Sequence, residues 1–163
     1  MSNPEMQMYS TRLMDKLQTI DRAYEEYAKA KGLTYISITV LEIIFAYQDT
    51  CTQKLICDQT HYPKQSVNLV VKSFWESGYV ELKETTSDRR NKMILLTEKG
   101  RKYAEEIITP LWTADEVAVS SLGTQKRDEL IRLLEIYGNS YCEFVDETIR
   151  NGGNNESTKE ARE

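Results

Sequence analysis

Two short stretches of the sequence contain side chains suited to contacting nucleic acid. In the first, "PKQSVNLVVKSFWESG" (63–78), the spacing of Gln65, Asn68 and Lys72 places all three on one face of a predicted helix. Glutamine and asparagine can each present a donor and an acceptor to an adenine edge, and lysine can reach a guanine or a phosphate. This face suits the DNA major groove, although an ordinary solvated helix face is the commoner explanation for three polar residues taken alone.

The second stretch, "TTSDRRNKMILLTEKG" (85–100), carries Arg89 and Arg90 at the tip of a predicted turn. Arginine is favoured in narrow minor grooves, because their negative potential is enhanced and a guanidinium sheds its water more readily than an ammonium. Residues 61–102 hold nine Lys or Arg and five acids, a surplus of four positive charges in a chain of net charge -5. Such a basic segment is typical of a nucleic-acid site, and also of a segment made basic for solubility alone.

Hydrophobic periodicity predicts the helices that must position these residues. An apolar stripe predicts a first helix that stops at Gly32; its members are Leu13, Leu17, Ile20, Tyr24 and Tyr27. The run "LTYISITVLEIIFAY" is rich in β-branched residues, but Thr34 is a good N-cap and the run exceeds normal strand length, so we predict a helix. Thr52 is expected to cap a short third helix through about Asp58.

A fourth helix and a two-stranded ribbon are predicted to follow. Proline at position 63 suits a first helical turn, and Gly78 ends the helix, whose expected buried face consists of Val67, Val70, Val71 and Phe74. Alternating residues in "YVELKE" and "KMILL" predict strands on either side of the polar turn "TTSDRRN". A helix, a turn, a helix and a ribbon form a winged helix, whose wing tip can reach the minor groove beside the recognition helix.

Two further helices are predicted toward the C-terminus. Thr97 caps a helix through Ile107, Ile108 and Leu111, and a final helix from about Thr124 carries the apolar residues Leu130, Leu133, Leu134, Tyr137, Tyr141, Phe144 and Val145. These stripes need a partner, which is either a second subunit or the same chain folded back on itself. We expect a homodimer, partly because two DNA-reading lobes can then span successive major grooves.

The stretch from Leu33 to Tyr103 resembles the MarR family of bacterial transcriptional regulators. The resemblance rests on "LTYISITVL", the helix-turn-helix, "WESGYVE" and "SDRRNKMILLTEKG". It implies a mostly α fold with a small two-stranded β wing, a winged helix-turn-helix whose terminal helices form a dimerisation region. The family's wing motif falls on Asp88 and Arg90, where the arginine is expected to enter the minor groove and the aspartate to orient it through a bidentate pair.

The resemblance also implies a function and a domain organisation. A dimeric repressor is expected to leave a pseudo-palindromic operator when a small aromatic or phenolic ligand binds between the dimer helices and the DNA-binding lobe. Residues 33–103 would form the DNA-binding domain, 1–32 and 104–150 the dimerisation region, and 151–163, which contain no large apolar residue, a disordered tail. The predicted DNA-binding residues are Lys64, Gln65, Ser66, Asn68, Lys72, Asp88, Arg89, Arg90 and Lys92.

Other classes of protein find little support in the sequence. The chain has one histidine, His61, and neither a Gly-rich phosphate loop nor a nucleophile elbow, so we do not expect an enzyme. Cys51, Cys57 and Cys142 lack CxxC spacing, which favours reduced, buried thiols over a disulfide framework, a metal site or another cofactor. The aromatic residues Tyr24, Tyr27, Tyr47 and Trp112 are more typical of a core than of a ligand cage.

The remaining expectations concern location and the main alternative. The chain contains no apolar run of roughly 18 residues, and "MSNPEMQMYS" lacks the pattern of a signal peptide, so we expect a cytoplasmic protein without a membrane partner. The alternative function is a winged-helix module that contacts proteins and does not bind DNA. Arg89, Arg90 and Lys92 in the wing argue against it.

Overall fold

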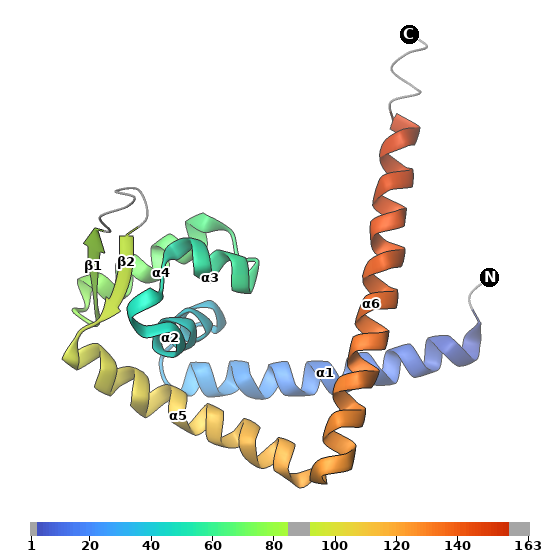
Figure 1. The fold of residues 1–163 in the computed structure, drawn as a ribbon, viewed down its shortest axis with the longest axis horizontal. Coiled ribbons are helices and arrows are strands. Elements are labelled where there is room, and N and C mark those ends of the chain that lie inside the picture. The colour runs from blue at the N-terminus through green and yellow to red at the C-terminus, as the bar shows by residue number, and fades with distance from the viewer. Residues whose placement is uncertain (1–2, 85–91, 157–163) are drawn as a thin grey trace. The chain divides into compact units, whose positions relative to one another are not determined.

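The computed structural model describes residues 3–84 and 92–156, with side chains as far as residue 151. The chain divides into two compact units, Met1–Trp112 and Thr113–Glu163. The elements are α1 (Pro4–Ala30), α2 (Tyr35–Tyr47), the short 3-10 helix η1 (Gln48–Thr50), α3 (Gln53–Thr60), α4 (Lys64–Glu76), β1 (Val80–Glu84), β2 (Lys92–Leu96), α5 (Glu98–Ser121) and α6 (Gly123–Glu156). The predicted fold class, mostly α with a small two-stranded wing, is confirmed (Figure 1).

The helix boundaries follow from side-chain caps that the sequence predicts. The Thr34 hydroxyl accepts a hydrogen bond from the Ser37 amide at 3.1 Å, and the Thr52 hydroxyl accepts one from the Leu55 amide at 3.1 Å. Each bond satisfies an amide that the first helical turn leaves without a partner. The predicted starts of α2 and α3 are confirmed, and α3 ends at Thr60, two residues later than expected.

The helix α2 forms although its sequence is rich in β-branched residues. Its side chains Ile38, Val40, Leu41 and Ile44 are fully buried. A helix with apolar residues on most of its faces is stable only when other elements surround it. Burial of these side chains therefore outweighs the strand propensity of the segment, and the predicted helix is confirmed.

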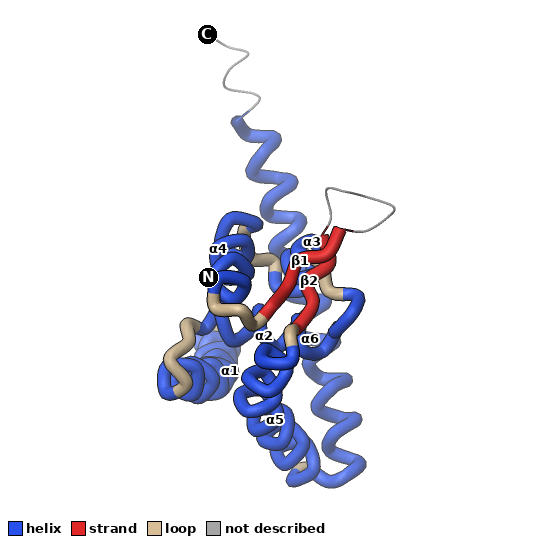
Figure 2. Tube along the Cα trace, turned by 90° about the vertical axis from the view of Figure 1, so that its left-hand side faces the viewer, coloured by secondary structure: helices blue, strands red, loops and turns tan. Residues whose placement is uncertain are grey.

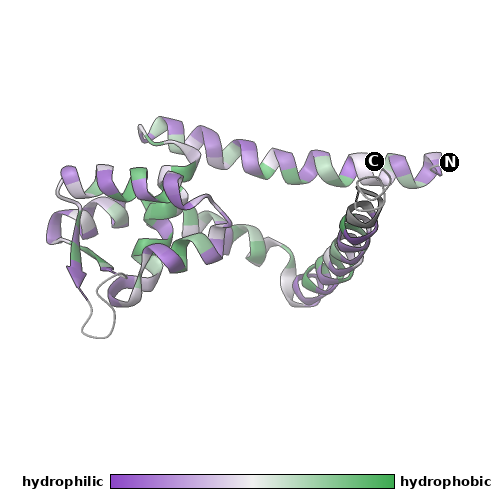
Figure 3. Ribbon diagram, turned by 90° about the horizontal axis from the view of Figure 1, so that it is seen from above, coloured by the Kyte–Doolittle hydropathy of each residue, from purple (hydrophilic) through white to green (hydrophobic). Residues whose placement is uncertain are grey.

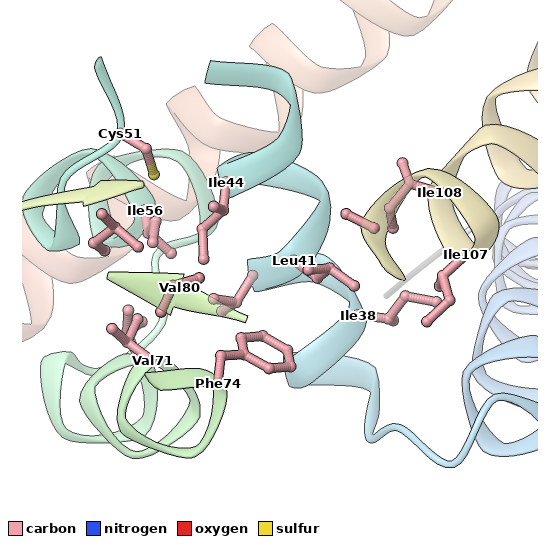
Figure 4. Packing of buried hydrophobic residues seen from close by; sticks show 14 of the residues in the cluster. Ile38, Leu41, Ile44, Cys51, Ile56, Val71, Phe74, Val80, Ile107 and Ile108 are labelled. Carbon is pink, nitrogen blue, oxygen red and sulfur yellow. The ribbon is translucent and has the colours of Figure 1, made fainter. Parts of the chain in front are cut away.

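The core of the first unit is built around α2. Figure 4 shows Ile38 and Leu41 between Phe74 of α4 on one side and Ile107 and Ile108 of α5 on the other. The buried residues of this core are Ala28, Ile38, Val40, Leu41, Ile44, Cys51, Ile56, Val67, Val71, Phe74, Val80, Ile94, Ala104, Ile107 and Ile108. The winged helix and the two helices α1 and α5 thus share one core.

The wing is an antiparallel pair with a fixed register. Strands β1 and β2 lie side by side (Figure 2). Val80 pairs with Leu96, and the ladder continues to the pair Glu84 and Lys92. The Ile94 amide donates a hydrogen bond to the Cys51 carbonyl at 2.8 Å, which ties β2 to the segment that precedes α3. Because Val80 and Ile94 are buried, the inner face of the wing is part of the core.

The second unit contains the end of α5 and all of α6. Helix α5 continues to Ser121, ten residues beyond the predicted region, and α6 starts at Gly123, one residue before the predicted start. Helix α6 ends at Glu156, so it includes six residues of the segment expected to be a disordered tail. Glycine disfavours a helix by only about 1 kcal/mol per residue, so the pair Gly152 and Gly153 does not by itself end one.

Candidate nucleic-acid interface

The helix α4 presents a polar face and buries an apolar one. Val67, Val71 and Phe74 are buried, and Val70 is half-buried. The side chains of Lys64, Gln65, Asn68 and Lys72 are exposed, and Ser66 is half-buried. The predicted division of this helix into two faces is therefore confirmed.

The turn before α4 determines where the helix starts. His61 adopts a left-handed conformation with φ 56° and is exposed, and the Tyr62 amide donates to the Thr60 hydroxyl at 3.1 Å. Pro63 occupies the N-cap position and supplies no side-chain cap. The amides of the first turn of α4 therefore receive no side-chain cap from Pro63, and the helix dipole adds a partial positive charge at this end.

A cavity of about 510 Å³ lies beside the polar face of α4, between α3, α4 and the wing. It is lined by Gln53, Lys54, Cys57, Lys64, Asn68, Val71, Leu82, Lys92 and Ile94. Three lysines from three different elements converge there, together with the amide side chains of Gln53 and Asn68. The arrangement can accept an anionic, hydrogen-bonding surface such as a DNA backbone with an adjacent base edge.

Two polar residues of this lining, Gln53 and Lys54, were not among the predicted contacts. Both belong to the first turn of α3, where a cation is disfavoured by the helix dipole. A lysine placed against that preference, immediately after the Thr52 cap, is the signal that could have indicated a role in binding. Lys54 also lies 3.7 Å from Asp58, in an exposed i,i+4 pair of the kind that contributes little to stability.

Lys72 forms an ion pair with Glu76, which was not predicted from the sequence. Its Nζ lies 3.6 Å from Oε1 of Glu76, one helical turn further along the exposed face. Both side chains are more than half exposed, so solvent screens the pair and either group can exchange its partner for another. Glu76 nevertheless lowers the positive charge of the face that α4 would present to DNA.

The predicted wing-tip residues Asp88, Arg89 and Arg90 lie outside the described residues. The described part of the wing ends at Glu84 and Lys92, which face each other across the ladder. Of the nine predicted contacts, the structure brings Lys64, Asn68 and Lys92 together around the cavity, and it places Gln65 and Lys72 on the exposed face of α4.

A junction between the wing and α5 fixes the base of the ribbon. The Thr97 hydroxyl donates to the Gly78 carbonyl at 2.8 Å and accepts from the Gly100 amide at 2.9 Å. The rings of Tyr79 and Tyr103 stack with centroids 4.1 Å apart and planes 9° apart. The motifs "WESGYVE" and "LTEKG" therefore meet in space, and together they hold the wing in place beside α4.

A second polar junction connects α1, α2 and α5. The Tyr24 hydroxyl donates to Oε2 of Glu42 at 2.9 Å, and the Trp112 indole N–H donates to Oε1 of the same carboxylate at 2.8 Å. The Tyr27 hydroxyl donates to the Ile107 carbonyl at 2.9 Å. Burial is the main cause that raises the pKa of Tyr24 above its ordinary value. Tyr24 and Tyr27 are half-buried against the core, as expected, whereas Tyr47 and Trp112 are exposed, so the interpretation of those two as core is wrong.

The cysteines occupy three different environments. Cys51 is fully buried, and burial raises the pKa of its thiol to about 12. Cys57 is half-buried and lines the cavity, whereas Cys142 is exposed on α6. The expectation of buried thiols is confirmed for Cys51 and wrong for Cys142, which is exposed.

Within the described part of the chain, no three His, Cys, Asp or Glu side chains form a group that could hold a metal ion. No single described helix has both the length and the apolar composition needed to cross a membrane. The bent pair formed by α1 with the segment Tyr35–Thr50 meets those two criteria jointly, but the apolar residues of α2 are part of the core described above.

Comparison with known proteins finds one matching family model and solved structures with the same fold. Residues 31–91 match the model of the MarR family. Two solved structures share the fold at low identity. A MarR family regulator from Neisseria meningitidis has a TM-score of 0.71 at 23% identity, covering 85% of this chain and 96% of its own. The S. aureus MepR–DNA complex has a TM-score of 0.65 at 19% identity, covering 82% and 97%. No curated protein was found to be similar to this sequence.

Proposed function

We propose that this chain binds DNA as a member of the MarR family of winged helix-turn-helix regulators. The protein acts as a dimeric transcriptional repressor in the cytoplasm, and it binds a pseudo-palindromic operator through α4 and the wing. Members of this family are generally not enzymes, and we assign this chain no catalytic activity. Residues 33–103 serve as the DNA-binding domain, and residues 1–32 and 104–150 serve as the dimerisation region.

One observation carries this proposal, the convergence of lysines and amides beside the exposed face of α4. Lys54, Lys64 and Lys92 come from α3, α4 and β2, and they surround a cavity that Asn68 also lines. Lysines supply the phosphate contacts that position a protein on DNA, and amide side chains supply base contacts that read sequence. The same fold occurs in the S. aureus MepR–DNA complex.

The dimer is supported by apolar side chains that remain exposed on the terminal helices. Figure 3 shows hydrophobic residues recurring along α1 and along α6 among hydrophilic ones. The large exposed ones are Met6, Met8, Tyr9, Leu17 and Ile20 on α1, and Leu130, Ile131, Leu133, Leu134, Ile136, Tyr141, Phe144, Val145 and Ile149 on α6. None of the residues 113–151 is buried. A second copy of the chain would remove these side chains from water.

Release by a small aromatic or phenolic ligand is the part of the proposal that rests on the family resemblance. A cavity of about 280 Å³ lies between α1 and α2, and it is lined by Gln18, Asp21, Arg22, Glu25 and Tyr35. Asp21 and Glu25 contribute two negative charges to this lining against the one positive charge of Arg22, so we do not assign the cavity to an anionic ligand. Benzoate, as a simple aromatic carboxylate, is the probe for a first titration of the DNA complex.

The experiment that tests DNA binding is a titration at several salt concentrations. Fluorescence anisotropy of a labelled duplex, selected by the full chain from a random pool, gives the binding constant. We expect its logarithm to fall linearly with the logarithm of salt concentration, with a slope that Lys92→Ala reduces by about one unit. Lys126→Ala, which removes the same charge from α6, is the matched control and should leave the slope unchanged. A winged-helix module that contacts only proteins would not bind any DNA duplex, so no salt-dependent binding constant would be measured.

A further inference from the structure

The exposed polar face of α4 also carries a leucine, Leu69, to which the proposed function assigns no role. Leu69 is 62% exposed, although the same helix buries Val67, Val71 and Phe74 in the core. A leucine side chain left in water forgoes the favourable free energy of burying its apolar surface. A single exposed leucine is common on protein surfaces, so the significance of Leu69 depends on the side chains that surround it on α4.

Helical spacing places Leu69 among the residues proposed to read DNA. It follows Gln65 by four positions and precedes Lys72 by three, so the three side chains lie on one face, and Asn68 is its neighbour in sequence. The leucine is thus flanked by two amides and a lysine. The occupant of this face must offer hydrogen-bonding groups and negative charge next to a small apolar group.

The major groove of DNA offers that combination at A·T pairs. Adenine presents N7 and N6–H to an amide side chain, while thymine presents its C5-methyl group, which is the apolar feature of the groove. A leucine has no donor or acceptor, so the thymine methyl is the group on a base edge that it can contact favourably. We propose that Leu69 reads a thymine methyl in the operator, which makes it a specificity-determining residue of the proposed DNA site.

The position of the thymine follows from helix and duplex geometry. One turn of α4 separates Leu69 from Gln65, which corresponds to about 5.4 Å along the helix axis. Base pairs are spaced by about 3.4 Å along a strand. The thymine therefore lies within about two base pairs of the base that Gln65 contacts. This inference rests on the proposed function, because it requires α4 to enter the major groove.

Replacement of thymine by deoxyuridine tests the contact, because it removes the methyl group and keeps every hydrogen-bonding group. The probe is a duplex selected by the full wild-type chain from a random pool, with each thymine replaced in turn. We expect a loss of about fourfold in affinity at one or two positions of each half-site, the effect of one buried methyl group. With Leu69→Ala, the affinities for the thymine and deoxyuridine duplexes should become equal at those positions.

Val117→Ala is the matched control, since Val117 is 64% exposed and lies on α5 outside the winged helix. It should retain the wild-type ratio of thymine to deoxyuridine affinities, whatever its effect on absolute affinity. Two outcomes would overturn the role of Leu69 and leave DNA binding intact. In the first, the selected duplex has no position at which deoxyuridine lowers the affinity. In the second, deoxyuridine still lowers the affinity of Leu69→Ala at the same positions. Failure to select or bind any duplex would overturn the proposed function, and the role of Leu69 with it.

Discussion

The backbone of Gly100 lies directly against the carbonyl group of Tyr79. A β-carbon built on Gly100 would overlap with the Tyr79 carbonyl oxygen, and its next neighbours are also Tyr79 backbone atoms. Glycine is therefore required at this position for reasons of space. The contact brings the first turn of α5 onto the start of the wing, and the Thr97 hydroxyl completes the junction by accepting a hydrogen bond from the Gly100 amide.

Gly100→Ala should therefore destabilise the fold. A backbone atom cannot move aside as the end of a flexible side chain can, so we expect a loss of at least about 2 kcal/mol in the free energy of unfolding, measured by urea denaturation. Arg101→Ala, an exposed change in the next residue, is the control and should stay within about 0.5 kcal/mol of wild type. Equal stability of Gly100→Ala and wild type would show that the junction can adjust.

Cys51 should make the stability of the fold depend on alkaline pH. Its thiol pKa is raised from 9.0 to about 12 in the folded chain. Below pH 9 the thiol is protonated in both states, so the full stability is present. Between pH 9 and 12 only the unfolded chain ionises, and stability should fall by about 1.4 kcal/mol per pH unit.

Comparison of wild type with Cys51→Ala isolates this effect. Urea denaturation at pH 8, 9 and 10 is the measurement, and the slope between pH 9 and 10 is the quantity to compare. The raised pKa values of Tyr24, Tyr35 and Tyr103 contribute mainly above pH 10, where tyrosines of the unfolded chain ionise. Cys51→Ala should show a shallower slope, whatever its absolute stability. Parallel curves for the two proteins would contradict the assignment.

Local sequence signals could predict the elements, but not the groups that several elements bring together. The caps Thr34, Thr52 and Thr97 are visible in sequence because each acts on amides within three residues. In contrast, Glu42 accepts hydrogen bonds from Tyr24 and Trp112, which are 18 and 70 residues away. Hydrophobic periodicity does not predict contacts between residues so distant in sequence.

The same distinction holds within the candidate DNA interface. The polar face of α4 could be predicted because helical period alone places Gln65 and Asn68 together. The cavity could not, since its lysines come from α3, α4 and β2 and meet only through tertiary packing. The Lys72–Glu76 pair is different, because its i,i+4 spacing is present in the sequence and is sufficient to predict the pair.

Gln65→Ala and Asn68→Ala should reduce specificity rather than general affinity. If these amides read base edges, each change should cost about 1 to 3 kcal/mol on the selected duplex and little on a random duplex. Anisotropy titrations of both duplexes at one salt concentration provide the comparison. Equal losses on the two duplexes would indicate that the amides contribute no base readout.

Glu76→Gln should strengthen binding to selected and random DNA alike. The change releases Lys72 from its partner at 3.6 Å, so that its ammonium group can pair with a phosphate. Because exposed i,i+4 pairs contribute about 0.3 to 0.5 kcal/mol, we expect an increase of about twofold in affinity. Lys72→Ala should abolish the gain. Glu129→Gln, which breaks the Arg132 pair on α6, is the control and should not change DNA affinity. A gain that persists in the Lys72→Ala background would assign the effect to Glu76 alone.

The wing provides the last prediction, which concerns Asp88 and Arg90. If Arg90 enters the minor groove, Arg90→Ala should nearly eliminate binding to the selected duplex. Arg90→Lys should restore it only partly, since lysine keeps the charge but loses the planar fork and sheds its water less readily. Arg89→Ala should cost less, because Arg89 is expected to meet a phosphate.

Asp88→Ala separates an oriented arginine from a merely basic wing. Removing a negative charge near DNA should strengthen binding if net charge alone matters, whereas it should weaken binding if the carboxylate holds Arg90 in position. Affinities of wild type, Asp88→Ala, Arg90→Ala and the double variant form a thermodynamic cycle, measured at one salt concentration with the dimer confirmed for each by sedimentation. We expect the double variant to bind no more weakly than Arg90→Ala, because an aspartate without its arginine has nothing to orient. Tighter binding by Asp88→Ala, or additive effects of the two changes, would leave the wing as a basic patch without an oriented arginine.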